Sequence, residues 1–264
     1  PAKQQIQKLE TKYKGFYIDW AQKGSATGYD VEYSVNANMS GAVSKHLTAN
    51  KPDTLTVSGL SGDKTYYVRV RSYTNVNGKV YYGAWSDIKS IKTANNDIAK
   101  ASVSGISTKA FTGKAITQNV TVKVGNTVLK NGTDYTVSYS NNKKVGKATV
   151  KITGKGKYGG VITKTFKINP AKQEIQKLTA KSKAFFVDWA QKGSATGYEI
   201  QYATNSKFTG AKKVTITNSK TDKTTVSKLS ANKKYYVRVR SYTTVGGTKY
   251  YGTWSAVKNV TTKK

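Results

Sequence analysis

The side chains that most often carry catalysis are scarce in this sequence. The chain has no cysteine and one histidine, His46, in a stretch that we interpret as a polar loop. One histidine supplies neither a histidine-based metal site nor a histidine-driven triad, and thiol chemistry is absent. The 13 acidic residues fall mostly on expected strand faces beside basic residues, or in turns. We find no acid pair whose surroundings would raise one pKa, so we expect neither hydrolase activity nor a cofactor.

Positive charge is the most prominent chemical property of the chain. The net charge is +32 and the pI is close to 10.0. Residues 1–94 carry 13 basic and 7 acidic residues, residues 95–169 carry 13 and 2, and residues 170–264 carry 19 and 4. Such a balance attracts nucleic acid, anionic cell-wall polymers or acidic glycans. Two interpretations stay open: a solvated surface that resists aggregation, and a surface that binds an anionic polymer.

An internal repeat with a constant offset of 169 residues organises the chain. The repeated stretches include 1–4 with 170–173, 21–29 with 190–198, and 66–74 with 235–243. The stretch between the copies matches neither of them. We therefore expect three domains, at residues 1–94, 95–169 and 170–264, within a longer tandem array. Arrays of this kind build length and multivalency rather than an active site.

Apolar and polar residues alternate through both copies, as in half-buried strands. Phe16, Ile18 and Trp20 fall on one face of a run whose other face carries Tyr17 and Asp19. Glycine-containing turn signals separate the runs, and helical periodicity is absent. About seven short strands in some 90 residues indicate a β-sandwich, so the expected fold class is all-β with three tandem immunoglobulin-like sandwiches.

The spacing of large residues in each copy resembles the fibronectin type III family. The residues that carry the resemblance are Trp20, Tyr29, Val31, Tyr33, Leu60, Tyr66, Val68, Val70 and Trp85, with Trp189, Tyr198, Ile200, Tyr202, Leu229, Tyr235, Val237, Val239 and Trp254 in the second copy. The resemblance covers about 94 residues of each copy. It implies that Trp20 and Trp189 are core residues, and that Tyr66 and Tyr235 are tyrosine-corner residues whose hydroxyls bond nearby backbone.

The resemblance also gives the arginines a structural interpretation. The four arginines of the chain are Arg69, Arg71, Arg238 and Arg240, and all should point away from the cores. Because the last strands of this fold pair, these arginines can stack on Trp85 and Trp254, similar to the tryptophan–arginine ladder of cytokine-receptor fibronectin domains. Asp30 and Glu32 should lie on the adjoining strand and form cross-strand ion pairs with the arginines.

A binding patch is the alternative interpretation of the same region. Exposed tyrosine and tryptophan rings can stack on sugar rings, so the expected ligand is a glycan. The residues of this candidate patch are Tyr73, Tyr81, Tyr82 and Trp85 in the first copy and Tyr242, Tyr250, Tyr251 and Trp254 in the second.

The middle stretch shows short alternating runs and motifs of its own. Phe111-Thr112-Gly113-Lys114 precedes a strand pattern, and Gly132-Thr133-Asp134-Tyr135 opens another. These motifs resemble the small immunoglobulin-like modules of Firmicute surface proteins. Glycines 154, 156, 159 and 160 are interpreted as hairpin glycines, because no helix follows them to make a phosphate loop.

The sequence therefore predicts a non-catalytic structural or adhesive segment of a bacterial cell-surface or secreted protein. It would act as a spacer or a multivalent binding rod, monomeric and semi-rigid within a longer chain, with short linkers near Thr93–Ala99 and at Pro170. The alternatives are a carbohydrate-binding module and an electrostatic binder of an anionic cell-wall polymer or nucleic acid. No run of apolar residues is long enough to span a membrane, and no groove-reading helix predicts sequence-specific nucleic-acid recognition.

Overall fold

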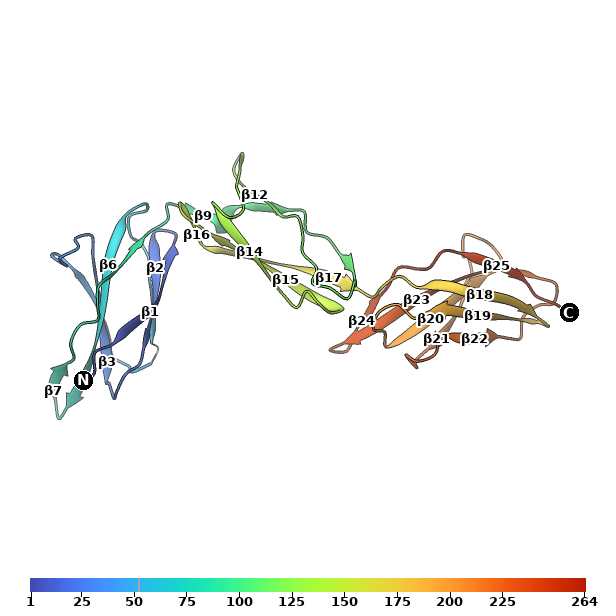
Figure 1. Ribbon diagram of the computed structural model, residues 1–264, viewed down its shortest axis with the longest axis horizontal. Helices are drawn as coiled ribbons and strands as arrows, with labels where there is room; N and C mark the ends of the chain where they lie inside the picture. Colours follow the sequence, from blue (N-terminus) through green and yellow to red (C-terminus); the bar gives the residue numbers. More distant parts are fainter. Residues whose placement is uncertain (52) are drawn as a thin grey trace. The chain divides into compact units, whose positions relative to one another are not determined.

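The structure is a computed structural model that describes residues 1–51 and 53–264. The chain forms two compact units. Unit 1 comprises Pro1–Ser104, Thr121–Ser138 and Lys151–Thr163, and unit 2 comprises Gly105–Val120, Tyr139–Val150 and Lys164–Lys264. The described residues are almost entirely strands and turns, with one short 3-10 helix, Ile98–Lys100, so the fold is all-β, as the alternating sequence predicts (Figure 1).

Two antiparallel sheets form the first repeat copy, within unit 1. The smaller sheet has the order β1 (Gln5–Lys12), β2 (Gly15–Ala21), β5 (Thr54–Val57). The larger sheet has the order β4 (Val43–Leu47), β3 (Gly28–Ser34), β6 (Thr65–Val76), β7 (Lys79–Tyr82), and β8 (Lys89–Lys92) also pairs with β6. Pairing of β6 with two successive strands places Trp85 between β7 and β8, beside the middle of β6.

The second copy repeats this arrangement within unit 2. One sheet has the order β18 (Glu174–Lys181), β19 (Ala184–Ala190), β22 (Lys223–Val226). The other has the order β21 (Lys212–Ile216), β20 (Gly197–Ala203), β23 (Lys234–Val245), β24 (Thr248–Tyr251), and β25 (Lys258–Thr261) pairs with β23.

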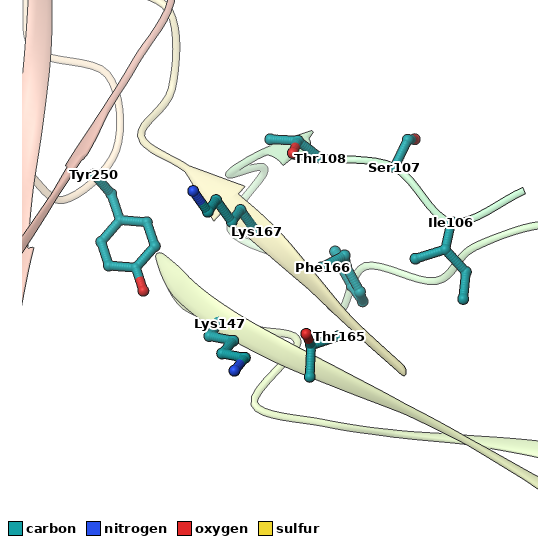
Figure 2. A pocket seen from close by; sticks show the side chains of 8 residues that line it. All are labelled: Ile106, Ser107, Thr108, Lys147, Thr165, Phe166, Lys167 and Tyr250. Atoms are coloured by element: carbon teal, nitrogen blue, oxygen red, sulfur yellow. The ribbon is translucent and has the colours of Figure 1, made fainter. Parts of the chain in front are cut away.

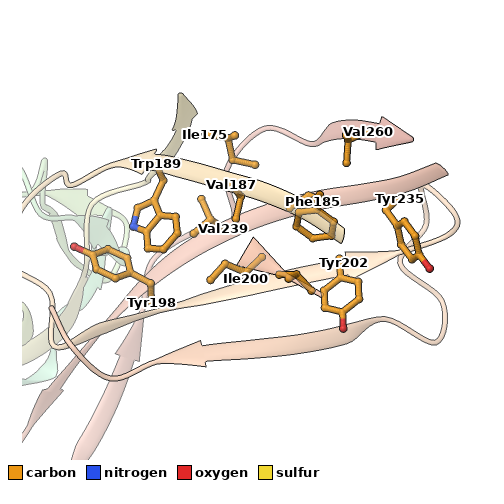
Figure 3. Packing of buried hydrophobic residues seen from close by; sticks show 12 residues of the cluster. Ile175, Phe185, Val187, Trp189, Tyr198, Ile200, Tyr202, Tyr235, Val239 and Val260 are labelled. Atoms are coloured by element: carbon orange, nitrogen blue, oxygen red, sulfur yellow. The ribbon is translucent and has the colours of Figure 1, made fainter. Parts of the chain in front are cut away.

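Each copy has its own hydrophobic core between its two sheets. In the second copy Trp189 is 1% exposed and lies against Tyr198, with ring centroids 5.2 Å apart; Figure 3 shows them in the cluster with Phe185 and Ile200. The first copy places Trp20 in the equivalent position, fully buried. Burial of each large aliphatic or aromatic side chain contributes about 1.5–3 kcal/mol, so period-2 alternation suffices to select these faces.

The two core tyrosines near the start of β6 and β23 each accept a backbone hydrogen bond. The N–H of Ser61 donates to the Tyr66 hydroxyl at 3.3 Å, and the N–H of Ser230 donates to the Tyr235 hydroxyl at 3.2 Å. Both rings are buried. The bond joins the loop before the strand to the strand itself, which is the tyrosine-corner arrangement.

The middle segment contains short strands arranged in three sheets, and the boundary between the units passes through it. Its strands are β9 (Asn96–Asp97), β10 (Ser102–Ser104), β11 (Lys109–Ala110), β12 (Thr121–Val124), β13 (Thr127–Val128), β14 (Tyr135–Ser140), β15 (Gly146–Gly154), β16 (Tyr158–Gly159) and β17 (Val161–Asn169). The sheet orders are β10-β12-β13, β11-β17-β15-β14 and β16-β9.

Two local expectations are wrong. His46 lies in β4 and not in a loop: it pairs with Asp30 of β3, because the polar run Val43–Leu47 adds an edge strand to the larger sheet. The stretch expected to be a linker, Thr93–Ala99, contains strand β9 and the start of the 3-10 helix. Short edge strands of mostly exposed residues carry little hydrophobic alternation, so the sequence pattern does not reveal them.

Candidate functional site

Outward-facing arginines of β6 meet the aromatic rings of the first copy. Val68 and Val70 point into the core, so Arg69 and Arg71 point to the opposite face of the sheet. The guanidinium carbons lie 4.3 Å and 4.4 Å from the Trp85 ring centroid, and that of Arg71 is also 3.8 Å from the centroid of Tyr82. Both arginines therefore stack on the one tryptophan.

Carboxylates of β3 neutralise these two arginines. Arg69 donates to Glu32 Oε2 from Nε at 2.9 Å and from Nη2 at 2.7 Å, and Arg71 donates from Nε to Asp30 Oδ2 at 3.0 Å. His46 Nδ1 lies 2.7 Å from the other oxygen of Asp30, and its ring stacks on Tyr73 at a centroid distance of 4.6 Å. The face is thus a closed network of stacked and ion-paired side chains.

The second copy keeps the stacking but changes the ion pairs. Arg240 donates to Glu199 Oε2 from Nε at 2.8 Å and from Nη2 at 2.6 Å, and Lys213 Nζ lies 2.7 Å from Oε1 of the same carboxylate. Arg238 pairs with no carboxylate of residues 1–51 and 53–264, and it donates from Nε to Gln201 Oε1 at 2.8 Å. Its guanidinium carbon lies 4.8 Å from the ring centroid of Trp254.

The protonation of Glu199 reflects its two cationic neighbours. Its side chain is 3% exposed, and this burial alone would raise its pKa. The hydrogen bonds and charges of Lys213 and Arg240 outweigh burial, and they hold the pKa of Glu199 below the ordinary value of 4.5. The carboxylate therefore stays ionised at neutral pH.

Most of the candidate glycan patch is covered. Tyr73 is 4% exposed and Tyr242 is 3% exposed, so neither presents a ring face. Trp85 and Trp254 are half-buried, and arginines stack on both. Tyr81 and Tyr82 are about half exposed, whereas Tyr250 and Tyr251 are partly buried. A guanidinium lies against Tyr82 and another against Tyr251. The geometry favours the structural interpretation of these aromatic residues.

A lysine-lined pocket includes Tyr250, a residue of the candidate glycan patch, and the sequence did not predict this pocket. Figure 2 shows this pocket in unit 2, with a volume of about 460 Å³; Lys147, Lys167 and Tyr250 are among its lining residues. An adjoining pocket of about 630 Å³ shares Lys147 and Tyr250 and adds Lys143 and Lys144. No acidic residue lines either pocket. Lysines scattered along a sequence give no signal of such a cluster, because only folding brings β15 and β17 together.

Within residues 1–51 and 53–264, no three histidine, cysteine, aspartate or glutamate side chains gather in a way that could hold a metal ion. Within the same residues no helix has the length and apolar character needed to cross a bilayer.

A family model matches most of the second copy. Residues 170–257 match the family model described as the Fibronectin type III domain. A solved structure, the crystal structure of chicken CNTN1 FN1-FN3 domains, is similar at 16% sequence identity and a TM-score of 0.32, covering 100% of this chain and 99% of that chain. No curated protein matches the chain. The chain is all-β by its own strands, and residues 170–257 are similar to the fibronectin type III family.

Proposed function

We propose that this chain is a non-catalytic structural or adhesive segment of a bacterial cell-surface or secreted multidomain protein, acting as a spacer or a multivalent binding rod, with domains at residues 1–94, 95–169 and 170–264. The observation that carries the proposal is the closed network on the larger sheet of the first copy, which the second copy repeats with changed ion pairs. The most reactive side chains there are engaged with one another: Arg71 contacts Tyr82, Trp85 and Asp30. Their role is to stiffen the domain, and tandem modules of this kind are typically non-enzymatic.

Backbone contacts near Asn96 support a spacer that resists bending between the first copy and the middle segment. Strand β9 pairs with β16, and the N–H of Asn96 donates to the carbonyl of Lys157 at 3.1 Å. A side chain at Gly159 would overlap the backbone of Lys12 and Tyr13. Close backbone approach of this kind leaves a joint little freedom, as expected of a semi-rigid rather than a flexible connection.

Electrostatic binding of an anionic cell-wall polymer is the second candidate. It is supported by the lysine-lined pockets and by the charge of residues 95–169, where 13 lysines face two acids. No lysine of the described part of this segment forms an ion pair with an acid, in contrast to Lys192 and Lys213 of the second copy. Carbohydrate binding by the tyrosine and tryptophan residues remains the third candidate, carried by the exposure of Tyr81 and Tyr82.

One sedimentation experiment separates these candidates. The protein is mixed with purified Gram-positive cell walls, with and without teichoic acids, and with insoluble glycans, at low and physiological salt. A pure spacer stays in solution under all conditions. Binding that requires teichoic acid and falls steeply with salt supports the polymer binder, because neutralised phosphates release counterions. Salt-resistant binding to one glycan supports the third candidate and contradicts a spacer that makes no contacts of its own.

A further inference from the structure

The two repeat copies differ at three aligned positions around one arginine of the larger sheet. Glu32, Met39 and Ser44 of the first copy correspond to Gln201, Phe208 and Lys213 of the second. The register is the same in both: Arg69 lies opposite Glu32, and Arg238 lies opposite Gln201. One carboxylate is therefore lost and one ammonium is gained, while an aromatic ring replaces a thioether.

These changes leave Arg238 without an anionic partner. Its Nε donates to Gln201 Oε1, and no acceptor in the described part of the chain takes a hydrogen bond from its Nη atoms. In the first copy Arg69 uses both Nε and Nη2 on the Glu32 carboxylate. In the second copy Gln201 takes only the hydrogen bond from Nε, so the Nη atoms of Arg238 are available to a ligand.

Aromatic rings nevertheless hold Arg238 in one orientation. Its guanidinium carbon lies 4.0 Å from the Phe208 centroid and 4.8 Å from the Trp254 centroid. Phe208 is 9% exposed and is positioned by a tight turn with a φ of +58°. Because the stem and both flanking rings are fixed, little side-chain freedom remains to be lost when a ligand binds.

The surrounding charge is positive. Glu199 is the carboxylate of this face, and it is shared by Lys213 and Arg240. Two of the cations on this face, Lys213 and Arg240, contact Glu199, whereas Arg238 does not. Burial and the nearby charge of Arg240 lower the pKa of Arg238 from its ordinary value, but an arginine stays protonated at neutral pH. A half-buried cation that lacks an ion-pair partner and is already oriented favours the binding of an anion.

We propose that Arg238 forms a binding site for a carboxylate ligand on the second copy, on a face that also carries Lys213, and that the first copy lacks this site because Glu32 fills it. A planar guanidinium edge matches the two oxygens of a carboxylate with parallel hydrogen bonds. The site is independent of the spacer role and of the lysine-lined pockets, since it lies on the outer face of β20 and β23.

The four arginines of the chain allow a direct test by nuclear magnetic resonance. The Nε–Hε signals of ¹⁵N-labelled full-length chain are assigned with single arginine-to-lysine variants. Three carboxylates are then titrated: acetate as the simple carboxylate, glucuronate as a sugar acid and N-acetyl-aspartate as an amino-acid derivative. Chloride at equal ionic strength is the control. The expected result is a saturable shift of the Arg238 signal and no saturable shift of Arg69. Equal shifts with chloride, or no shift at Arg238, would overturn the proposal.

The first copy supplies the matched variant. Gln201→Glu recreates the arrangement around Arg69, so it should remain folded, and it should remove the saturable shift of Arg238 for every carboxylate. Gln201→Ala, which adds no charge, should retain the shift. Retention of the saturable shift in Gln201→Glu would show that binding occurs elsewhere and would overturn the assignment. A tighter response to glucuronate than to acetate or N-acetyl-aspartate would identify a sugar acid as the source of the carboxylate.

Discussion

Individual side chains decide how the larger sheets use their charges. In both copies an arginine pair stacks on one tryptophan, yet the acids that neutralise the pair differ. Asp30 and Glu32 each take one arginine in the first copy, whereas Glu199 takes Arg240 and Lys213 in the second. Glu199 is therefore the residue on which the electrostatic stability of the second copy depends most.

We predict that Glu199→Gln lowers the free energy of unfolding of the second copy by about 2 kcal/mol at pH 7, the size of a lost hydrogen bond to a charged group. The pKa of Glu199 is lowered in the folded state, so its contribution is complete above its ordinary value of 4.5. The contribution is lost as the pH falls through the lower, folded-state pKa. Denaturant unfolding of variant and parent from pH 7 to pH 3 should therefore show two converging curves.

The matched control for this pH dependence is Glu174→Gln. Glu174 also forms an ion pair, with Lys192, but its side chain is 67% exposed, so solvent screens the attraction. This variant should unfold close to the parent at every pH. A stability difference for Glu199→Gln that persists unchanged at pH 3 would contradict the assigned role of its charge.

At the scale of elements, the sheets depend on close approach between backbone segments. Gly28 and Gly197 begin the central strands β3 and β20, and an added Cβ there would overlap the carbonyl oxygens of Leu47 and Ile216 respectively. An added Cβ at these two glycines would also overlap the hydroxyls of Tyr73 and Tyr242. Packing of a buried tyrosine over a glycine thus sets the distance between the central strand and its edge strand.

We predict that Gly197→Ala destabilises the second copy by about 1–3 kcal/mol, because the methyl group must push strand β21 or Tyr242 aside. Gly246→Ala provides a contrast: its added Cβ meets no atom, so only its positive φ is strained. Thermal unfolding followed by circular dichroism measures both. An unchanged melting temperature for Gly197→Ala would show that β21 moves away without loss.

For the molecule as a whole, two separate cores imply two separate contributions to stability. The clusters around Trp20 and Trp189 contain no residue in common, and each lies within its own repeat copy. Domains that hold their own cores unfold independently unless a large interface couples them.

We predict that Trp189→Ala lowers the stability of the second copy by about 3–5 kcal/mol, the usual loss for a large buried aromatic side chain. The transition of the first copy should stay in place, and Trp20→Ala should produce the reciprocal pattern. Scanning calorimetry resolves the transitions. A shift of every transition by either variant would instead show that the cores are energetically coupled.

The sequence by itself determined the fold class, because alternation of apolar and polar residues at period 2 selects strands and their buried faces without reference to partners. The same pattern placed Trp20 and Trp189 on the core faces and Arg69 and Arg71 outside. It could not identify the edge strand that contains His46, whose residues are mostly exposed and carry no alternation.

The tertiary structure decided the contacts that are specific to the second copy. Arg238 is distant in sequence from Gln201 and Phe208. Only the pairing of β20 with β23 and the turn at Phe208 bring the three side chains together. It also buried Tyr73 and Tyr242, which the sequence analysis includes in the candidate patch of exposed rings. Contacts between distant residues depend on register and on rotamers, and neither property is written in the local pattern of a strand.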